Sequence, residues 1–241
     1  MQRLQAGYWP CLFCVVLTGR LAARLKERTG NMMRIETIMV GQMGTNCYLA
    51  WDEESKRGFL VDPGEQADKI IRVCSRYEIK PEAILLTHGH FDHIMAAKKV
   101  KEYYQIPIYA GIHEEELLAD AQKNLSAMWA EGFTMKADEL VTDNQKLEIA
   151  GMKITVIETP GHTLGGVCYY IEKEHVLFAG DTLFFESYGR TDFPGGSMFL
   201  LIRSLGKKLF VLPDETDVYP GHGQATSIGY EKTHNPAAGM R

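Results

Sequence analysis

The run Thr87-His88-Gly89-His90-Phe91-Asp92-His93 gathers three imidazoles and a carboxylate in one short stretch. Burying ionisable side chains without partners costs several kcal/mol each, so ordinary core packing does not account for such a run. Imidazole and carboxylate groups are ligands for zinc and similar divalent ions. The run follows the apolar stretch 83–86, which predicts a buried strand. The candidate ligands therefore leave the end of a strand, where α/β folds place their sites.

Three later segments repeat this order of an apolar stretch, a turn with Gly or Pro, and one candidate ligand. The stretch 154–158 precedes His162, the stretch 175–179 precedes Asp181, and the stretch 217–219 precedes His222. Glycine in such turns lets the backbone bend sharply and approach an ion. The remaining histidines, His113, His175 and His234, lie outside these turns and are interpreted as surface or hydrogen-bonded residues.

The candidate ligands are too many for one ion, because zinc takes about four ligands. They are His88, His90, Asp92, His93, His162, Asp181 and His222. This set suits two divalent ions that share one carboxylate. Two ions roughly 3.5–4 Å apart can hold a hydroxide between them and bind a substrate oxygen. Zinc is the default expectation, and iron and manganese accept the same ligands.

Four motifs carry a resemblance to the metallo-β-lactamase-fold hydrolases, from about Met33 to the C-terminus. They are Thr-His-Gly-His-Phe-Asp-His, Thr-Pro-Gly-His-Thr, Gly-Asp-Thr-Leu-Phe and Tyr-Pro-Gly-His-Gly. The resemblance implies an α/β fold, a four-layer αββα sandwich. It also implies that one metal is bound by His88, His90 and His162, and the other by Asp92, His93 and His222, with Asp181 bridging the two.

Within this family the chain looks like a short bacterial subgroup of the glyoxalase II group, whose members hydrolyse thioesters such as S-lactoylglutathione. The segment 184–192 carries this likeness. True β-lactamases of the fold usually have Cys where Asp181 stands and lack a histidine like His93. Arg190 matches a basic position that contacts the thiol carrier, so the resemblance implies a substrate-binding role for it. Full-length glyoxalase II adds a helical domain with further basic contacts, and only nineteen residues follow His222 here.

The implied reaction is attack of a metal-bridging hydroxide on the thioester carbonyl, with Asp92 and Asp181 as the catalytic carboxylates. The leaving thiolate has a pKa of about 8.5 and needs no strong general acid. Asp62 is equally consistent with a partner for a ligand histidine and with a turn residue before Pro63.

Two alternatives to thioester hydrolysis stay open. The first is another reaction on the same site, either lactone hydrolysis or iron-dependent persulfide oxidation, the latter using fewer of the ligands. The second is a non-catalytic metal-binding protein. A structural zinc site closes at four ligands, which disfavours the second alternative.

These ligands need strands that end beside one another and helices that cover the sheets. We expect strands at 34–40, 46–51, 58–61, 83–86, 107–110, 146–149, 153–158, 167–171 and 176–179. Helices are expected at 67–77, 94–104 and 197–210. Residues 33–241 are expected to form one domain, preceded by an N-terminal extension, residues 1–32, outside the fold.

Composition bounds the partners and the compartment. A net charge of −5 and a pI of about 5.9 disfavour a nucleic-acid partner. The expected partner is the small-molecule thioester that the resemblance implies. The apolar run 11–17 is too short to cross a bilayer, so no stable membrane insertion is expected. Five scattered cysteines give no disulfide framework and predict a cytoplasmic protein. The oligomeric state does not follow from the sequence.

Overall fold

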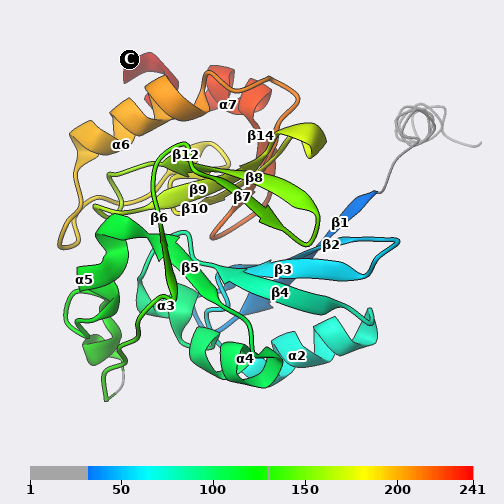
Figure 1. Ribbon diagram of the computed structural model, residues 1–241. Coiled ribbons are helices and arrows are strands. Elements are labelled where there is room, and N and C mark those ends of the chain that lie inside the picture. The colour runs from blue at the N-terminus through cyan, green and yellow to red at the C-terminus, as the bar shows by residue number, and fades with distance from the viewer. Residues whose placement is uncertain (1–31, 130, 241) are drawn as a thin grey trace, which may run out of the picture. The chain divides into compact units, whose positions relative to one another are not determined.

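The computed structural model describes residues 32–129 and 131–240. The chain divides into two units, Met1–Met32 and Met33–Arg241, and the fold is that of the second unit. Apart from Met32, the predicted N-terminal extension lies outside the described residues. Two six-stranded sheets pack face to face, with helices on their outer faces (Figure 1). This arrangement confirms the predicted four-layer αββα sandwich.

The N-terminal sheet has the strand order β1-β2-β3-β4-β5-β6. Strands β1 to β3 pair antiparallel, and β3 to β6 pair parallel. The strands are β1 Met33–Val40, β2 Thr45–Asp52, β3 Arg57–Val61, β4 Lys80–Leu85, β5 Ile108–Gly111 and β6 Glu139–Val141. Because β3 and β4 run parallel, the residues that follow them meet at one edge of the sheet.

The C-terminal sheet has the strand order β14-β13-β10-β9-β8-β7. Its strands are β7 Lys146–Ile149, β8 Met152–Glu158, β9 Val167–Ile171, β10 Val176–Gly180, β13 Asp217–Pro220 and β14 Thr226–Ser227. Strand β9 is antiparallel to both β8 and β10, and β10 is parallel to β13. The carboxyl ends of β8, β10 and β13 therefore lie at the same edge. A separate hairpin pairs β11 Leu183–Phe184 with β12 Ser187–Tyr188.

Helices cover the two outer faces. The helices α2 Ala67–Arg76 and α4 Ala97–Tyr104 cover the N-terminal sheet (Figure 1). The short α3 Phe91–Ile94 precedes α4 in the chain, and α5 Glu115–Leu118 follows it. On the C-terminal sheet lie α6 Met198–Ser204, which continues as the π-helical η4 Leu205–Leu209, and α7 Ile228–His234. Short 3-10 turns η1 Ile112–Glu114, η2 Ser126–Met128, η3 Glu172–Glu174 and η5 Pro236–Met240 complete the described part.

Three apolar clusters fill the spaces between the four layers. One joins Leu49 and Ile84 to the inner faces of α2 and α4, one joins the two sheets around Phe59 and Phe178, and one joins Leu177 to α6 and α7. Strand β2 is buried at every position because both faces of its sheet are covered. No helix within the described ranges is long and apolar enough to cross a membrane.

The structure corrects two expectations about helices. The helix predicted at 94–104 is instead two helices, and α3 begins at Phe91, so Asp92 and His93 lie on a helical turn rather than in a loop. The sequence did not predict α7. Only Ile228 and Glu231 of its seven residues are buried, so it lacks a clear apolar stripe.

Candidate metal centre

The first group of candidate ligands joins the two sheets. His88 and His90 lie in the loop after β4, and His162 lies in the turn after β8. One ligand atom from each lies within 4.8 Å of the others, and all three side chains are buried. His90 Nδ1 and His162 Nε2 are 2.9 Å apart. Three imidazoles at this spacing can bind one divalent ion.

The second group joins the sheets in the same way. Asp92 and His93 lie on α3, and His222 follows β13. Their ligand atoms also lie within 4.8 Å of one another. His222 Nε2 is 3.2 Å from Asp92 Oδ2 and 3.4 Å from His93 Nε2.

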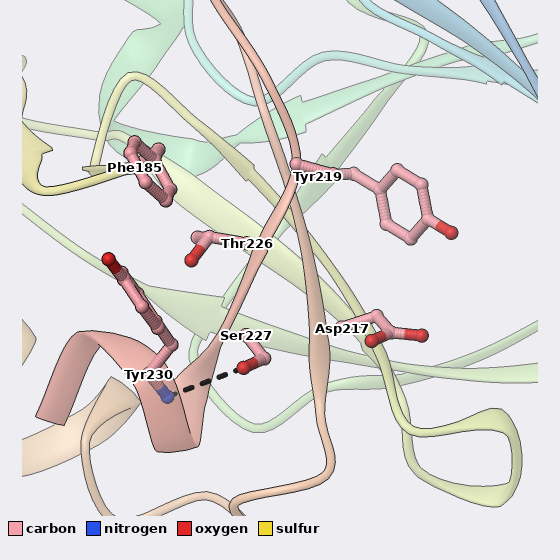
Figure 2. A pocket seen from close by; sticks show the side chains of 7 residues that line it. Phe185, Asp217, Tyr219, Thr226, Ser227 and Tyr230 are labelled. Carbon is pink, nitrogen blue, oxygen red and sulfur yellow. Dashed lines mark hydrogen bonds between the residues drawn. The ribbon is translucent and has the colours of Figure 1, made fainter. Parts of the chain in front are cut away.

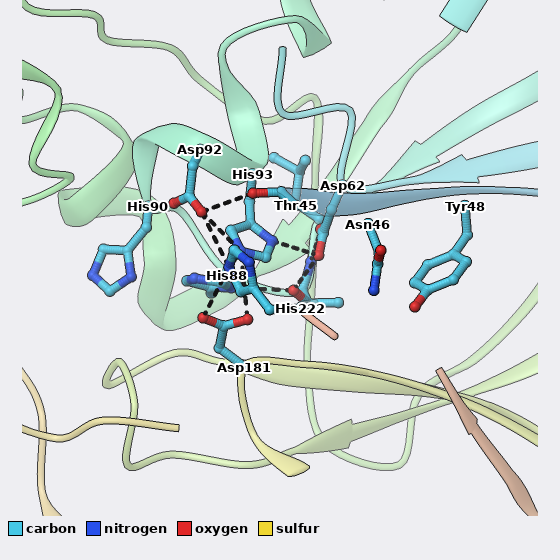
Figure 3. Close-up of polar contacts among 12 residues, drawn as sticks. Thr45, Asn46, Tyr48, Asp62, His88, His90, Asp92, His93, Asp181 and His222 are labelled. Atoms are coloured by element: carbon cyan, nitrogen blue, oxygen red, sulfur yellow. Dashed lines mark hydrogen bonds and ion pairs between the residues drawn. The ribbon is translucent and has the colours of Figure 1, made fainter. Parts of the chain in front are cut away.

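Asp181 faces the cluster and approaches histidines of both groups (Figure 3). Its Oδ2 is 3.6 Å from Nε2 of both His162 and His222, and its Oδ1 is 3.4 Å from His93 Nε2. A carboxylate that faces both groups is placed as a shared ligand would be. The structure thus brings all seven candidate ligands together, and their binding of metal stays a prediction.

Unpaired atoms in the cluster fit metal ions. Nε2 of His88, Nε2 of His90 and Oδ1 of Asp181 are buried and have no hydrogen-bond partner. Buried polar atoms are nearly always paired, so these three atoms call for an additional partner. Neutral imidazole nitrogens and a carboxylate oxygen are suitable donors for zinc or iron.

The electrostatics of the two groups differ. Burial, together with the neighbouring imidazoles, lowers the pKa of His88 far below its ordinary value and lowers the pKa of His90 to about 3. Burial also opposes a charge on His93, yet the carboxylates of Asp92, Asp181 and Asp62 outweigh it and raise the pKa of His93 to about 10. His88 and His90 are therefore held neutral, whereas His93 in the second group is held positively charged.

Asp62 supports the cluster from the end of β3. Its Oδ1 accepts a hydrogen bond from Thr87 N at 2.7 Å, and its Oδ2 accepts one from Thr87 Oγ1 at 2.6 Å. The same Oδ2 is 2.9 Å from His93 Nδ1. Because a carboxylate only accepts, the hydrogen of His93 is held on Nδ1 and Nε2 faces the cluster. Of the two roles considered for Asp62, the structure shows the histidine partner.

Strand β2 holds the turn of His222 through residues that the sequence did not indicate (Figure 3). Asn46 Nδ2 donates to the carbonyls of Pro220 at 3.0 Å and Gly223 at 2.9 Å, and Tyr48 Oη donates to Pro220 O at 2.5 Å. Thr45 Oγ1 donates to Asp92 Oδ2 at 2.9 Å. These contacts link residues far apart in the sequence, so no local motif could have found them.

Glu114 is another residue that the sequence did not indicate. It is fully buried, and its Oε2 accepts a hydrogen bond from Gly89 N at 2.7 Å. Its Oε1 accepts from Thr163 Oγ1 at 2.6 Å and from Gly165 N at 2.9 Å. One carboxylate therefore fastens the loop of His88 and His90 to the turn that follows His162.

The side chain of Arg190 lies at the rim of the site. It forms two parallel hydrogen bonds to Asp192, both 2.7 Å long, and stacks over the Phe193 ring at 3.9 Å. The carbonyl of Arg190 accepts a hydrogen bond of 2.8 Å from His162 Nδ1. The backbone carbonyl of Arg190 thus orients the candidate ligand His162. Contact between the Arg190 side chain and the substrate stays a prediction.

A cleft of about 600 Å³ opens over the cluster. It is lined by five candidate ligands and by apolar and polar side chains: Met43, His90, Phe91, Asp92, Leu125, Met128, Trp129, His162, Asp181, Phe184, Ser187, Tyr188, Arg190, Phe193 and His222. Another hollow of about 490 Å³, lined by residues such as Phe185, Tyr219 and Tyr230, contains none of the candidate ligands (Figure 2). The chemistry therefore belongs to the first cleft.

A four-layer sandwich with His and Asp groups at the ends of both sheets defines a metallo-hydrolase class of protein. Residues 40–222 match the sequence model of the Metallo-beta-lactamase superfamily, and the chain belongs to this superfamily. This confirms the family resemblance of the four motifs.

Two similar relatives are named as hydrolases. The probable metallo-hydrolase YqgX of Bacillus subtilis is 36% identical over 206 residues, covering 85% of this chain and 97% of the relative. Hydroxyacylglutathione hydrolase GloC of Haemophilus influenzae is 34% identical over 213 residues, again covering 85% of this chain and 97% of the relative.

Three solved structures are also similar. BLEG-1 B3 metallo-beta-lactamase has a TM-score of 0.81 and 41% identity, covering 84% of this chain and 98% of that one. TTHA1623 in a di-iron-bound form has a TM-score of 0.73 and 33% identity, covering 83% and 98%. ETHE1 from Myxococcus xanthus has a TM-score of 0.72 and 31% identity, covering 86% and 85%.

Proposed function

We propose that this protein is a dinuclear metal-dependent thioester hydrolase of the glyoxalase II type, acting on S-acyl thiol esters such as S-lactoylglutathione. The observation that carries the proposal is the pair of candidate ligand groups that both face Asp181, beside one cleft. The similarity to hydroxyacylglutathione hydrolase GloC supports the choice of a thioester.

His88, His90 and His162 would hold one ion, and Asp92, His93 and His222 the other, with Asp181 between them. When bound, two divalent ions lower the pKa of a water held between them and polarise the carbonyl of the substrate. Zinc is the proposed metal, and the di-iron form of TTHA1623 makes iron the first alternative.

The residues of the chain then position and stabilise this centre. Asp62 keeps the hydrogen of His93 on Nδ1, and the carbonyl of Arg190 does the same for His162. Overall, water adds across the C–S bond, giving a carboxylic acid and a thiol. The thiolate leaves readily because its pKa is about 8.5, so the cleft needs no additional acid.

Cys47, Cys74 and Cys168 are buried free thiols, which supports a cytoplasmic location.

The test is elemental analysis of the purified full chain combined with a substrate panel. The panel contains S-lactoylglutathione, other acyl thioesters, a lactone, a chromogenic cephalosporin and glutathione persulfide. We expect two divalent ions per chain and the highest kcat/KM on a thioester, with one thiol released per acid formed. One firmly bound ion per chain, with Asp92, His93 and His222 free of metal in a crystal, would contradict the dinuclear centre.

The second candidate function is iron-dependent persulfide oxidation, and the similarity to ETHE1 favours it. It differs in metal count, because a single iron needs fewer of these ligands. Oxygen uptake with glutathione persulfide, together with one iron per chain, would select this function. The similarity to BLEG-1 B3 metallo-beta-lactamase is tested by the cephalosporin in the panel, because its hydrolysis would select β-lactamase activity.

A further inference from the structure

Two large apolar side chains stand exposed beside the candidate metal ligands. Trp129 is 58% exposed and Met128 is 71% exposed, and both line the cleft. Trp129 stacks on Phe91, with ring centroids 5.5 Å apart and 22° between the planes. Phe91 itself stands between the candidate ligands His90 and Asp92 in the sequence. Apolar surface in a cleft of this kind indicates an apolar ligand.

The segment that carries these side chains is tied in place by hydrogen bonds. Asn124 is fully buried, its Nδ2 donates to Phe133 O at 2.7 Å, and its Oδ1 accepts from Ser126 N at 2.9 Å. Ser126 Oγ accepts from Phe133 N at 2.7 Å and donates to Phe133 O at 3.0 Å. Phe91 N donates to Asn124 O at 2.9 Å, which joins the segment to the helix of Asp92 and His93.

The backbone at Leu125 is strained. Its φ is +69°, a left-handed conformation that a leucine rarely adopts. The side chain of Leu125 is only 6% exposed and lines the cleft. Such strain persists only where the surrounding contacts enforce it, and it is concentrated at binding sites. The fold therefore holds this apolar side chain at the cleft at an energetic cost.

We propose that Phe91, Leu125, Met128 and Trp129 form an acyl-binding wall. These four side chains carry no charge and no hydroxyl, and the indole N–H of Trp129 is their single polar group, so a hydroxyl or carboxylate on the acyl group would gain at most one side-chain hydrogen bond there. Polar lining side chains outside the candidate ligands are Ser187, Tyr188 and Arg190, all from one other segment, which suits the thiol carrier. The preferred substrates are thioesters of apolar aliphatic or aromatic acids. This inference rests on the proposed thioester hydrolysis.

The experiment uses the full-length chain loaded with zinc and a series of glutathione thioesters with acetyl, butyryl, hexanoyl, phenylacetyl and lactoyl groups. We expect kcat/KM to rise up to about fourfold per added methylene, which corresponds to burial of one methylene at about 0.8 kcal/mol. Trp129→Ala and Met128→Ala should flatten this rise, so that the loss in kcat/KM relative to the wild type grows from the acetyl to the hexanoyl thioester. The control Phe199→Ala removes a side chain that is 74% exposed on α6, outside this cleft, and should keep the rise.

Different results would overturn the inference in distinguishable ways. A wild-type series that is flat, or highest for lactoyl, removes the acyl wall and leaves thioester hydrolysis standing. Hydrolysis of no thioester at all removes the proposed function and the wall with it. An unchanged rise in both Trp129→Ala and Met128→Ala, with a smaller oligomer by light scattering, would assign these side chains to a contact between copies of the chain.

Discussion

The two oxygens of Asp181 face different candidate ligands, which makes this residue the link between the groups. Asp181→Ala should lower kcat/KM on a thioester more than a hundredfold, about 2.8 kcal/mol of barrier, because both ions and their water lose a shared ligand. The apolar clusters do not include Asp181, so circular dichroism should show an unchanged fold. Activity within about tenfold of the wild type would contradict the bridging role.

The control for this substitution is Glu116→Ala, which removes a surface carboxylate whose side chain is 87% exposed. It should leave kcat/KM and the metal content unchanged, because Glu116 is exposed and its ion pair with Lys123 lies on the surface.

The two metal positions should respond differently to pH. Because the pKa of His93 is raised to about 10, both ring nitrogens of this imidazole are protonated and the ring is positively charged near neutral pH when no metal is bound. The pKa of His222 is also raised: burial opposes its charge, but Asp92 and Asp181 outweigh burial. Binding of metal must displace these protons, so affinity at this group should fall as pH falls. The lowered pKa values of His88 and His90 leave those side chains neutral.

We therefore expect the ion at Asp92, His93 and His222 to be lost first on acidification. Titration calorimetry in buffers of different ionisation enthalpy should show that protons are released when the ion binds at Asp92, His93 and His222. Stoichiometric loss of both ions at one pH would contradict this order.

Arg190 is expected to contact the anionic end of the thiol carrier, and Asp192 competes for the same guanidinium. Arg190→Ala should raise KM for a glutathione thioester roughly fivefold, about 1 kcal/mol, the net size of one ordinary hydrogen bond. A small uncharged thioester should be unaffected. Asp192→Asn frees the guanidinium and should lower KM for the glutathione thioester. Equal kinetics of all three proteins on both substrates would leave Arg190 as a surface residue.

At the scale of the elements, Glu114 joins two ligand-bearing loops through three accepted hydrogen bonds. In Glu114→Gln, an NH2 group replaces one of the two accepting oxygens. This NH2 group would face a hydrogen-bond donor and could not accept from it. We expect a loss of about 1–3 kcal/mol in the free energy of unfolding and weaker metal binding at His88, His90 and His162. Urea unfolding and chelator competition measure the two effects. Thr163→Val removes only one of the three bonds and should show a smaller loss; equal losses would contradict the joint role of Glu114.

The strands that precede the ligands were predictable because their signals are local. An apolar run followed by Gly or Pro marks the end of β4, β8, β10 and β13, and each ligand follows within a few residues. Short elements carry no comparable signal. β6 has three residues and α3 has four, too few to show a period, so both were missed or displaced.

The supporting contacts could not be predicted for a different reason. Asn46 reaches Pro220 across 174 positions of sequence, and Glu114 reaches Gly165 across 51. Such pairs meet only after the sheets have packed, and the residue types alone do not specify a partner. Asp62 was only partly predicted, because its place in the turn before Pro63 was equally consistent with a histidine partner and with a turn residue.

At the scale of the whole described unit, the candidate ligands come from both halves of the sandwich. His88, His90, Asp92 and His93 follow a strand of the N-terminal sheet, whereas His162, Asp181 and His222 follow strands of the C-terminal sheet. Each of the two proposed metal positions, His88, His90 and His162 on the one hand and Asp92, His93 and His222 on the other, combines ligands from the two halves. Bound ions would therefore join the sheets, and the carboxylates of Asp62, Asp92 and Asp181 would lose their main source of positive charge without them.

Removal of metal should accordingly lower the stability of the entire unit as well as its activity. An ion present at 1,000 times its dissociation constant stabilises the folded state by about 4.1 kcal/mol. For a domain of this size, each kcal/mol shifts Tm by about 2–4 °C, so chelation should lower Tm by roughly 8–16 °C per ion lost. Calorimetry of the holo, chelated and reloaded chain measures this shift. Asp181→Ala should show a smaller shift on chelation, because it binds the ions less tightly. A chelated chain that is free of metal by elemental analysis but keeps the holo Tm would show that the ions do not join the two halves.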